Sequence, residues 1–218
     1  MTIDQLESAC RAFVARVPAA DAAHDVAHVQ RVVSNVRWLT AVEQADPWVT
    51  LPSAWLHDCV AIAKDSPLRD QGSRLAAEAA VEFLSAIDDY PETKLEAVHH
   101  AIAAHSFSAN IPVRSLEAAV VQDGDRLDSL GAVGIARCLL VGGNLNRPLC
   151  SADDPFCDTR EPDDSRYTLD HFYAKLLKLP HSMQTAAGRA EAERRALLMQ
   201  QYLDQLRSEI SSGRLQGL

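Results

Sequence analysis

Hydrophobic residues recur along this chain every three or four positions, which is the spacing of one face of an α-helix. The clearest stripe lies within residues 21–45 and consists of Val29, Val32, Val33, Val36, Leu39 and Val42. No segment shows a persuasive two-residue alternation of the kind that marks a half-buried strand. The pattern therefore predicts an all-α fold.

Capping and helix-breaking residues predict where these helices begin and end. Thr2 and Gln5 match a capping box, and Pro18 ends the helix that follows them. The pair Gly142–Gly143 predicts the end of a helix over 131–143. Further helices are expected over 21–45, 50–63, 66–87, 91–107, 115–130, 168–179 and 186–210.

Residues 143–168 interrupt the helical pattern with a stretch rich in Pro, Asp and Asn. A connection of this length in a compact domain is usually functional or disordered. We expect it to fold near the mouth of a pocket and to help choose the substrate. The expected organisation is a single domain over 1–218, with a core at about 20–142, this loop, and C-terminal helices over 168–211.

Composition and charge narrow the class of protein. Of the 218 residues, 47% are hydrophobic, with only 9 Gly and 10 Pro, which is typical of a well-packed globular chain. The formal net charge of -9 argues against a duplex nucleic acid as partner, because phosphate neutralisation needs a clustered basic surface. A small phosphorylated substrate is compatible with this negative charge, since a metal ion and a few cationic side chains make the electrostatic potential inside one pocket positive.

The expected location is the cytoplasm. No apolar stretch approaches the ~20 residues that cross a bilayer, and the acidic start of the chain does not resemble a secretory signal. The chain contains five cysteines, Cys10, Cys59, Cys138, Cys150 and Cys157. The odd number and the lack of a C-x-x-C pair predict reduced thiols rather than a disulfide framework. A bridge between Cys150 and Cys157 is the one alternative.

Histidine and aspartate residues gather inside the predicted helices, where a polar side chain needs a partner. They are His24, Asp25, His28, His57, Asp58, His99, His100, His105, Asp123, Asp125 and Asp128. Taken singly, each is more simply a hydrogen-bonded core residue or a solvated helix edge. Taken together they favour a cation, because burying unpaired ions costs several kcal/mol each. We therefore expect a divalent metal ion among them.

The ordered motifs resemble the HD superfamily of metal-dependent phosphohydrolases, and within it a bacterial subgroup of stand-alone HD hydrolases. The resemblance spans about residues 20 to 200 and rests on "AHDVAHVQRV", "WLHDCV", "AIAAHSFS", "DGDRLDSLGAVGIAR" and "EPDDSRYTLDHFYAKLLKL". It implies a single HD-domain helical bundle with a C-terminal helical extension.

The resemblance also implies a role for each matching position. Metal ligands are implied at His28, at the doublet His57–Asp58 and at Asp125. From the residues alone Asp123, Asp125 and Asp128 all remain candidates for the closing ligand, and only the resemblance selects Asp125. The catalytic set implied is Asp58, His105 and Asp128, with His105 binding a second metal or a substrate phosphate and Asp128 supporting a ligand or facing the substrate.

The resemblance implies that His100 binds a second metal or the substrate phosphate. Lys64 and Arg126 are expected to contact the substrate because they lie close in sequence to the ligands, whereas a solvated surface position is the simpler expectation for the other candidate cations, Arg160, Arg166, Lys175 and Lys178. The sequence departs from the family after the doublet, because "KDSPLRD" lacks the glycine-then-lysine start that is common there. Lys64 therefore does not stand at the position where relatives have this lysine.

Two imidazoles and two carboxylates form a mixed site that suits Mn²⁺, Mg²⁺, Co²⁺, Ni²⁺ or Fe²⁺. The expected function is a metal-dependent phosphohydrolase in which a metal-activated water attacks phosphorus of a small phosphorylated compound, such as a nucleotide. Two alternatives stay open: a di-iron HD oxygenase, and a non-catalytic regulatory protein that binds metal or nucleotide. The sequence leaves the oligomeric state open, with a homodimer as one option.

Overall fold

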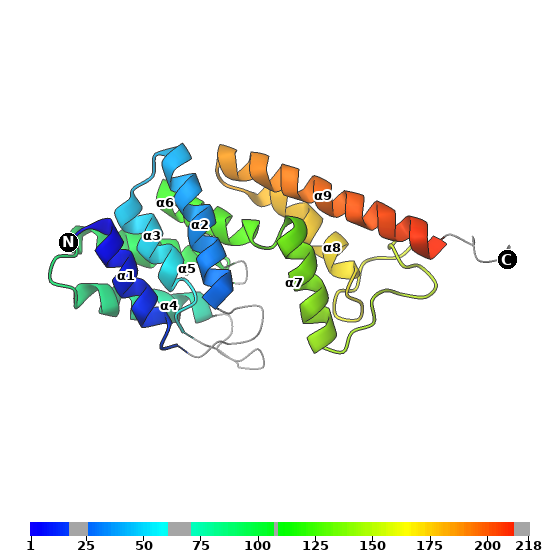
Figure 1. Cartoon of the computed structure of the whole chain (residues 1–218), viewed down its shortest axis with the longest axis horizontal. Coiled ribbons are helices and arrows are strands. Elements are labelled where there is room, and N and C mark those ends of the chain that lie inside the picture. The colour runs from blue at the N-terminus through cyan, green and yellow to red at the C-terminus, as the bar shows by residue number, and fades with distance from the viewer. Residues whose placement is uncertain (18–25, 61–70, 107–108, 212–218) are drawn as a thin grey trace. The chain divides into compact units, whose positions relative to one another are not determined.

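A computed structural model describes residues 1–17, 26–60, 71–106 and 109–211 of the chain (Figure 1). Throughout these residues the regular structure is helical and contains no strand, which confirms the predicted all-α fold. The described helices are α1 (Ile3–Val14), α2 (Val26–Glu43), α3 (Pro47–Leu56), α4 (Gly72–Ser85), η2 (Glu92–Lys94), α5 (Leu95–His105), α6 (Leu116–Leu127), α7 (Gly131–Asn144), α8 (Asp170–Ala174), η3 (Leu176–Ser182) and α9 (Ala186–Ser211).

None of the described helices combines the length and the apolar character that crossing a membrane requires.

The chain folds into two compact units. The first comprises Met1–Asp128 together with Met183–Gly188, and the second comprises Ser129–Ser182 together with Arg189–Leu218. Helices α1 to α6 therefore belong to the first unit, whereas α7, α8 and most of α9 belong to the second. The expected single domain with a core at about 20–142 stays a prediction.

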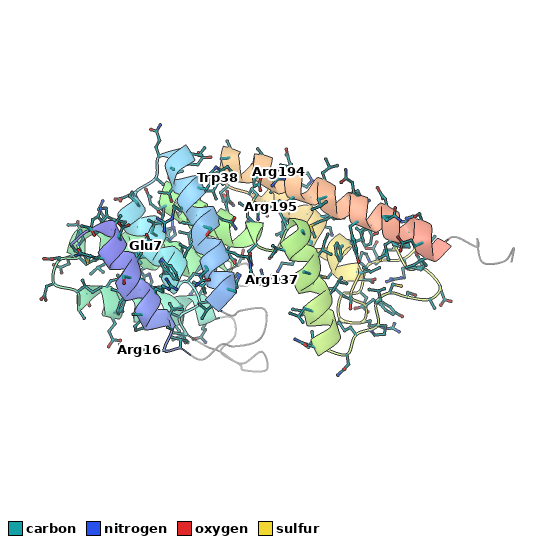
Figure 2. The ribbon with its side chains drawn as sticks, viewed as in Figure 1. Glu7, Arg16, Trp38, Arg137, Arg194 and Arg195 are labelled. Atoms are coloured by element: carbon teal, nitrogen blue, oxygen red, sulfur yellow. The ribbon has the colours of Figure 1, made fainter. Side chains whose placement is uncertain are left out.

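The capping box at the N-terminus is present as the sequence predicts. The Thr2 side chain accepts a hydrogen bond from the Gln5 backbone, and the Gln5 side chain accepts one from the Thr2 backbone. Glu7 lies on the same helix (labelled in Figure 2). Its buried carboxylate accepts hydrogen bonds from Arg37 at 2.6 Å and from Trp55 at 3.0 Å. One carboxylate thus fastens α1 to both α2 and α3.

Helix α3 ends earlier than the sequence predicts. The expected helix over 50–63 is present over 50–56, but the prediction is wrong at 57–60, because α3 stops at Leu56 and the His57–Asp58 doublet follows it. The last three residues of the expected helix lie outside the described residues. His57 is the C-cap residue, and the N–H of Cys59 donates to the Leu56 carbonyl, so the chain turns out of the helix at the doublet. The helix contains Pro52, which has no backbone N–H to donate to the carbonyl of Trp48. The hydroxyl of Tyr90 donates to the Trp48 carbonyl instead, at 2.8 Å.

Helices α2 and α6 approach each other closely at Gly124. A Cβ at this position would lie 2.3 Å from Cγ2 of Val36, so only glycine fits there. The side-chain amide of Asn35 also donates to the Gly124 carbonyl at 3.0 Å. This contact lies directly before Asp125 in the sequence and brings that residue next to α2.

In the second unit, α7 ends within one residue of the stop that the glycine pair predicts. Helix α7 continues through Gly142 and Gly143 to Asn144. Gly142 is also required for packing, because a Cβ there would lie 2.2 Å from the Thr168 hydroxyl. The helix expected over 168–179 is replaced by the short α8 and the 3-10 helix η3.

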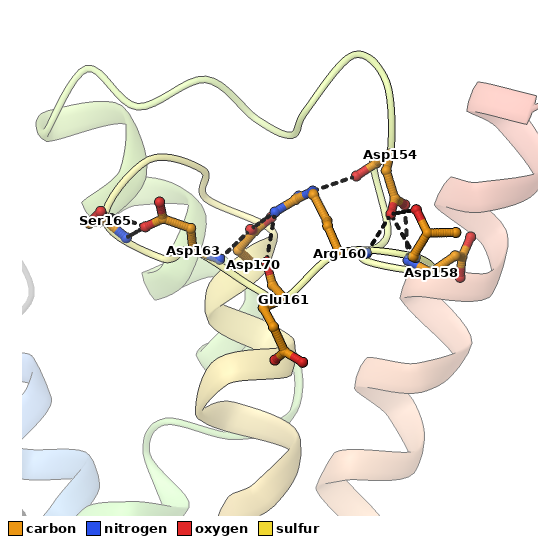
Figure 3. A network of polar contacts seen from close by, with 8 residues as sticks. Asp154, Asp158, Arg160, Glu161, Asp163, Ser165 and Asp170 are labelled. Atoms are coloured by element: carbon orange, nitrogen blue, oxygen red, sulfur yellow. Dashed lines mark hydrogen bonds and ion pairs between the residues drawn. The ribbon is translucent and has the colours of Figure 1, made fainter.

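Charged groups organise the long connection between α7 and α8 (Figure 3). Asp154 accepts backbone hydrogen bonds from Asp158, Thr159 and Arg160. The guanidinium of Arg160 makes two hydrogen bonds to the buried carboxylate of Asp170, at 2.5 and 2.8 Å. The loop is therefore held by ion pairs and backbone contacts, and its expected role in substrate choice stays a prediction.

Candidate metal centre

Three histidines of the first unit present the same ring nitrogen to one region. The Nδ1 atom of His57, after α3, lies 2.8 Å from the Ala54 carbonyl, and that of His105, the last residue of α5, lies 2.6 Å from the Ile102 carbonyl. The Nδ1 of His28, on α2, lies 2.7 Å from the Asp128 carboxylate. Because carbonyl oxygens only accept hydrogen bonds, Nδ1 of His57 and of His105 carries the proton, which leaves each Nε2 as an electron-pair donor.

Two carboxylates lie among these Nε2 atoms. Asp125 Oδ1 is 3.6 Å from Nε2 of His28. The Asp58 carboxylate lies 4.0 Å from Nε2 of His28, 3.4 Å from that of His57 and 3.7 Å from that of His105. Asp58 therefore faces all three imidazoles.

The donor atoms are close enough together to hold a metal ion. Within the part of the chain that the structure describes they form two overlapping groups, His28–His57–Asp125 and His57–Asp58–His105, each with ligand atoms within 4.8 Å of one another. Ligands at about 2.1 Å from a single ion are about 3 to 4.2 Å apart, so modest adjustment suffices. Nε2 of His57 is buried and has no hydrogen-bond partner among the described residues, which is expected for an atom that binds a metal ion.

The electrostatics of the cluster also favour a positive charge at its centre. Burial lowers the pKa of His57, but the carboxylates of Asp58 and Asp125 outweigh it and raise that pKa to about 9. Burial raises the pKa of Asp125, and the nearby histidines reverse the effect and lower it. Burial and the neighbouring His57 lower the pKa of His105. In the absence of a metal ion the two carboxylates thus favour a second proton on His57, at Nε2, and an ion bound at this nitrogen would take the place of that proton.

Asp128 lies behind His28 rather than among the converging donor atoms. Its carboxylate, which is 1% exposed as a residue, contacts Nδ1 of His28 and accepts hydrogen bonds from Nε of Arg31 at 2.7 Å and from Nη2 at 3.1 Å. The contact fixes the orientation of the His28 ring. Arg31 was not predicted from the sequence, although its position three residues after His28 places both on one face of α2.

Asp123, the third candidate of α6, faces a different segment. Its buried carboxylate accepts hydrogen bonds from the backbone N–H groups of Gln184 and Thr185, at 2.9 and 2.8 Å, and from the Thr185 hydroxyl. Burial raises its pKa, and these hydrogen bonds oppose the shift. The structure thus places Asp125, and not Asp123, beside His28.

The residues expected to contact substrate are less closely grouped. The half-buried His100 accepts a hydrogen bond from the backbone N–H of Arg114 at 3.1 Å. Arg126 is half-buried, and burial lowers its pKa against the opposing carboxylates of Asp123 and Asp125. Lys64 lies outside the described residues, as do His24 and Asp25. The substrate-binding roles of these residues stay predictions.

Comparison with known proteins gives the family. A scan against protein-family models finds no match. The uncharacterized protein YpgQ of Bacillus subtilis (strain 168) is 30% identical over 192 residues, which cover 86% of this chain and 84% of YpgQ.

Solved structures agree with this relationship. An HD-superfamily hydrolase from Bacillus thuringiensis has a TM-score of 0.75 and 32% identity, with 97% of this chain and 100% of that chain covered. Bacillus subtilis YpgQ in complex with ADP has a TM-score of 0.72 and 29% identity, with 97% and 98% covered.

The helical fold and the histidine–aspartate cluster define a hydrolase-type protein with residues suited to a metal ion. The chain belongs to the HD superfamily.

Proposed function

We propose that this protein is a metal-dependent phosphohydrolase that acts on a nucleotide. The observation that carries the proposal is the convergence of three buried imidazoles, through their Nε2 atoms, and two partly exposed carboxylates on one region. A relative of similar length, Bacillus subtilis YpgQ, has a structure in complex with ADP, which supports a nucleotide as the ligand.

The ion would be held by His28, His57, Asp58 and Asp125. When bound there, a divalent ion lowers the pKa of a coordinated water and polarises a phosphoryl oxygen. Asp58 is the most exposed member of the cluster, with 37% of its side chain accessible, so it marks the side from which a substrate enters. His105 faces the same carboxylate with an electron pair on Nε2, which is suited to accept a proton from water. Once protonated, the same Nε2 can donate a hydrogen bond to a phosphate oxygen.

The two candidate ligand groups share one residue and cannot both be complete at the same time. Both groups include His57, whose Nδ1 already contacts the Ala54 carbonyl. Its single remaining electron pair binds only one ion at a time. When His57 binds one ion, Asp58 and His105 remain available to a second, so the metal content of the purified protein is what separates the phosphohydrolase from the di-iron oxygenase.

The test is a screen of nucleoside mono-, di- and triphosphates and sugar phosphates for release of phosphate or pyrophosphate, with Mn²⁺, Mg²⁺, Co²⁺ and Ni²⁺ in parallel. We expect turnover of at least one nucleotide, and no turnover by Asp125→Asn. Nucleotide binding without release under any metal would instead support a regulatory protein. Two irons per chain together with oxygen consumption would support the oxygenase.

A further inference from the structure

The carbonyl groups at the C-terminal end of α5 are held by side chains from two other helices. The helix ends at His105, and the next residue, Ser106, is extended, so the carbonyls of the last turn lack the N–H partner that a continuing helix would supply. The hydroxyl of Ser73, on α4, donates to the Ala103 carbonyl at 3.0 Å. The side-chain amide of Gln122, on α6, donates to the Ala104 carbonyl at 2.7 Å.

These contacts lie in the interior of the first unit. Ala103 and Ala104 are 4% and 0% exposed, and Ser73 and Gln122 are 6% and 4% exposed. Water therefore has little access to either carbonyl, and among the described residues Ser73 and Gln122 donate to them.

The amide of Gln122 has a defined orientation. Its nitrogen must face the Ala104 carbonyl, because a carbonyl oxygen only accepts hydrogen bonds. Its oxygen accepts a hydrogen bond from the Gln184 side chain at 3.2 Å, which is consistent with that orientation. Both ends of the Gln122 amide are thus engaged, and the side chain forms a fixed link between α6 and the end of α5.

His105 depends on the geometry of this same turn. The Nδ1 of its ring donates to the carbonyl of Ile102, directly before the two carbonyls held by Ser73 and Gln122. A small rotation of the turn would move this acceptor and, with it, the direction of Nε2 toward Asp58, now 3.7 Å away.

From this arrangement we infer that Gln122 is a positioning residue for His105, with Ser73 as a second support. Gln122 acts through the Ala104 carbonyl and does not touch the ion or the substrate. The role deepens the proposed function and rests on it where turnover is concerned, but the orientation of the His105 ring is a property of the protein alone.

The test compares Gln122→Leu with the wild type by two measurements. We expect kcat to fall about 10- to 100-fold, the range usual for residues that support an active-site group. In the metal-free protein, histidine side-chain ¹⁵N NMR should show loss of the defined Nδ1–H form of His105. If Gln122→Leu does not fold, Ser73→Ala replaces it, with Ser73→Thr as the conservative variant that restores the hydroxyl and the NMR signal.

Two controls make the outcome specific. Ser85→Ala removes an equivalent hydroxyl-to-carbonyl contact at the exposed end of α4, to Glu82, and should change neither measurement. The double variant Gln122→Leu/His105→Ala should be no slower than His105→Ala alone, because both changes remove the same function.

Additive losses in the double variant would overturn the inference, as would a Gln122→Leu protein with an unchanged His105 signal. If the wild type turns over no nucleotide, the proposed function fails, and the NMR comparison still decides whether Gln122 orients His105.

Discussion

Asp123, Asp125 and Asp128 lie within about one and a half turns of α6 and its C-cap, and each carboxylate faces a different neighbour. Asp125 faces Nε2 of His28, and Asp128 faces Nδ1 of the same ring. Asp123 accepts hydrogen bonds from the backbone of Gln184 and Thr185. Residues of one type therefore have separable roles, which substitution can distinguish.

We expect Asp125→Asn to lose both the bound metal and activity, because it removes a charged ligand from the centre. Asp128→Asn should retain the metal and lose about 10- to 100-fold in rate, since it only loosens the His28 ring. Asp123→Asn should leave the metal affinity unchanged and lower the free energy of unfolding by about 1–3 kcal/mol, because one amide oxygen replaces two carboxylate oxygens in a buried site.

The measurements are metal content by mass spectrometry, initial rates and urea unfolding of the three variants. Loss of metal from Asp123→Asn, with Asp125→Asn still loaded, would exchange the roles assigned to these two residues.

The proton on His57 leads to a pH dependence of stability. The pKa of His57 in the folded, metal-free protein is about 9, above its ordinary value of 6.5. The stability that this proton contributes is therefore fully present below pH 6.5 and is lost as the pH rises through about 9. We expect the metal-free protein to unfold more easily at pH 9 than at pH 6.5, whereas metal binding should strengthen over the same interval because the ion displaces the proton.

Urea unfolding at pH 6.5, 7.5 and 9 measures this effect, with His57→Gln as the control. The free energy of unfolding should fall less steeply with rising pH in His57→Gln than in the wild type. An equal pH dependence in the two proteins would show that another group is responsible for it.

At the scale of helices, the position of α6 against α2 determines whether the ligands meet. The contact depends on Gly124, since a Cβ there would lie 2.3 Å from the Val36 side chain and 3.2 Å from its backbone nitrogen. The ligands on either side of this contact are His28 and Asp125. A change in helix separation is thus transmitted directly to the distance between two metal donors.

We expect Gly124→Ala to cost about 1–3 kcal/mol of stability through overpacking and to weaken metal binding at least about tenfold. Gly143→Ala is the matched control, because a Cβ at that helical position meets no atom within 4 Å. It should be neutral or should stabilise α7 by up to about 1 kcal/mol. Thermal unfolding and metal titration of both variants test this, and similar losses in the two would contradict the role of the α2–α6 contact.

The sequence predicts much at this scale, but not all. Periodicity and the Thr2–Gln5 capping box locate the start of α1 correctly, because both signals are local, but the helix ends at Val14 and not at Pro18 as predicted. The end of α3 before His57 was not predicted, since an apolar run has the same appearance inside a helix and in the turn after it. The partners of Asp123 could not be read from the sequence either, because they lie 61 and 62 residues away.

At the scale of the whole molecule, the candidate metal ligands and the long loop belong to different units. All five converging donors belong to the first unit, whereas residues 151–165 of the long loop belong to the second. A ligand stabilises only the part of a protein that it holds in the folded state.

Mn²⁺ at one hundred times its dissociation constant should therefore add about 2.7 kcal/mol of stability to the first unit. Replacing 151–165 by a short neutral linker should leave this increment unchanged. Hydrogen exchange, followed by mass spectrometry of peptides from each unit, separates the two contributions. A smaller increment in the loop variant would show that the loop contributes to metal binding.

The hydrogen bonds of Asp123 to residues 184–185 can form only after the metal ligands have been synthesised. Every residue of the proposed metal group leaves the ribosome before Ser129, whereas the donors to Asp123 follow 61 and 62 residues later. At about 5–20 residues per second, the nascent chain spends about 3 to 12 seconds with its ligands made and the Asp123 carboxylate still hydrated. A metal ion that binds during translation thus meets its ligands seconds before the segment that completes their unit has been synthesised.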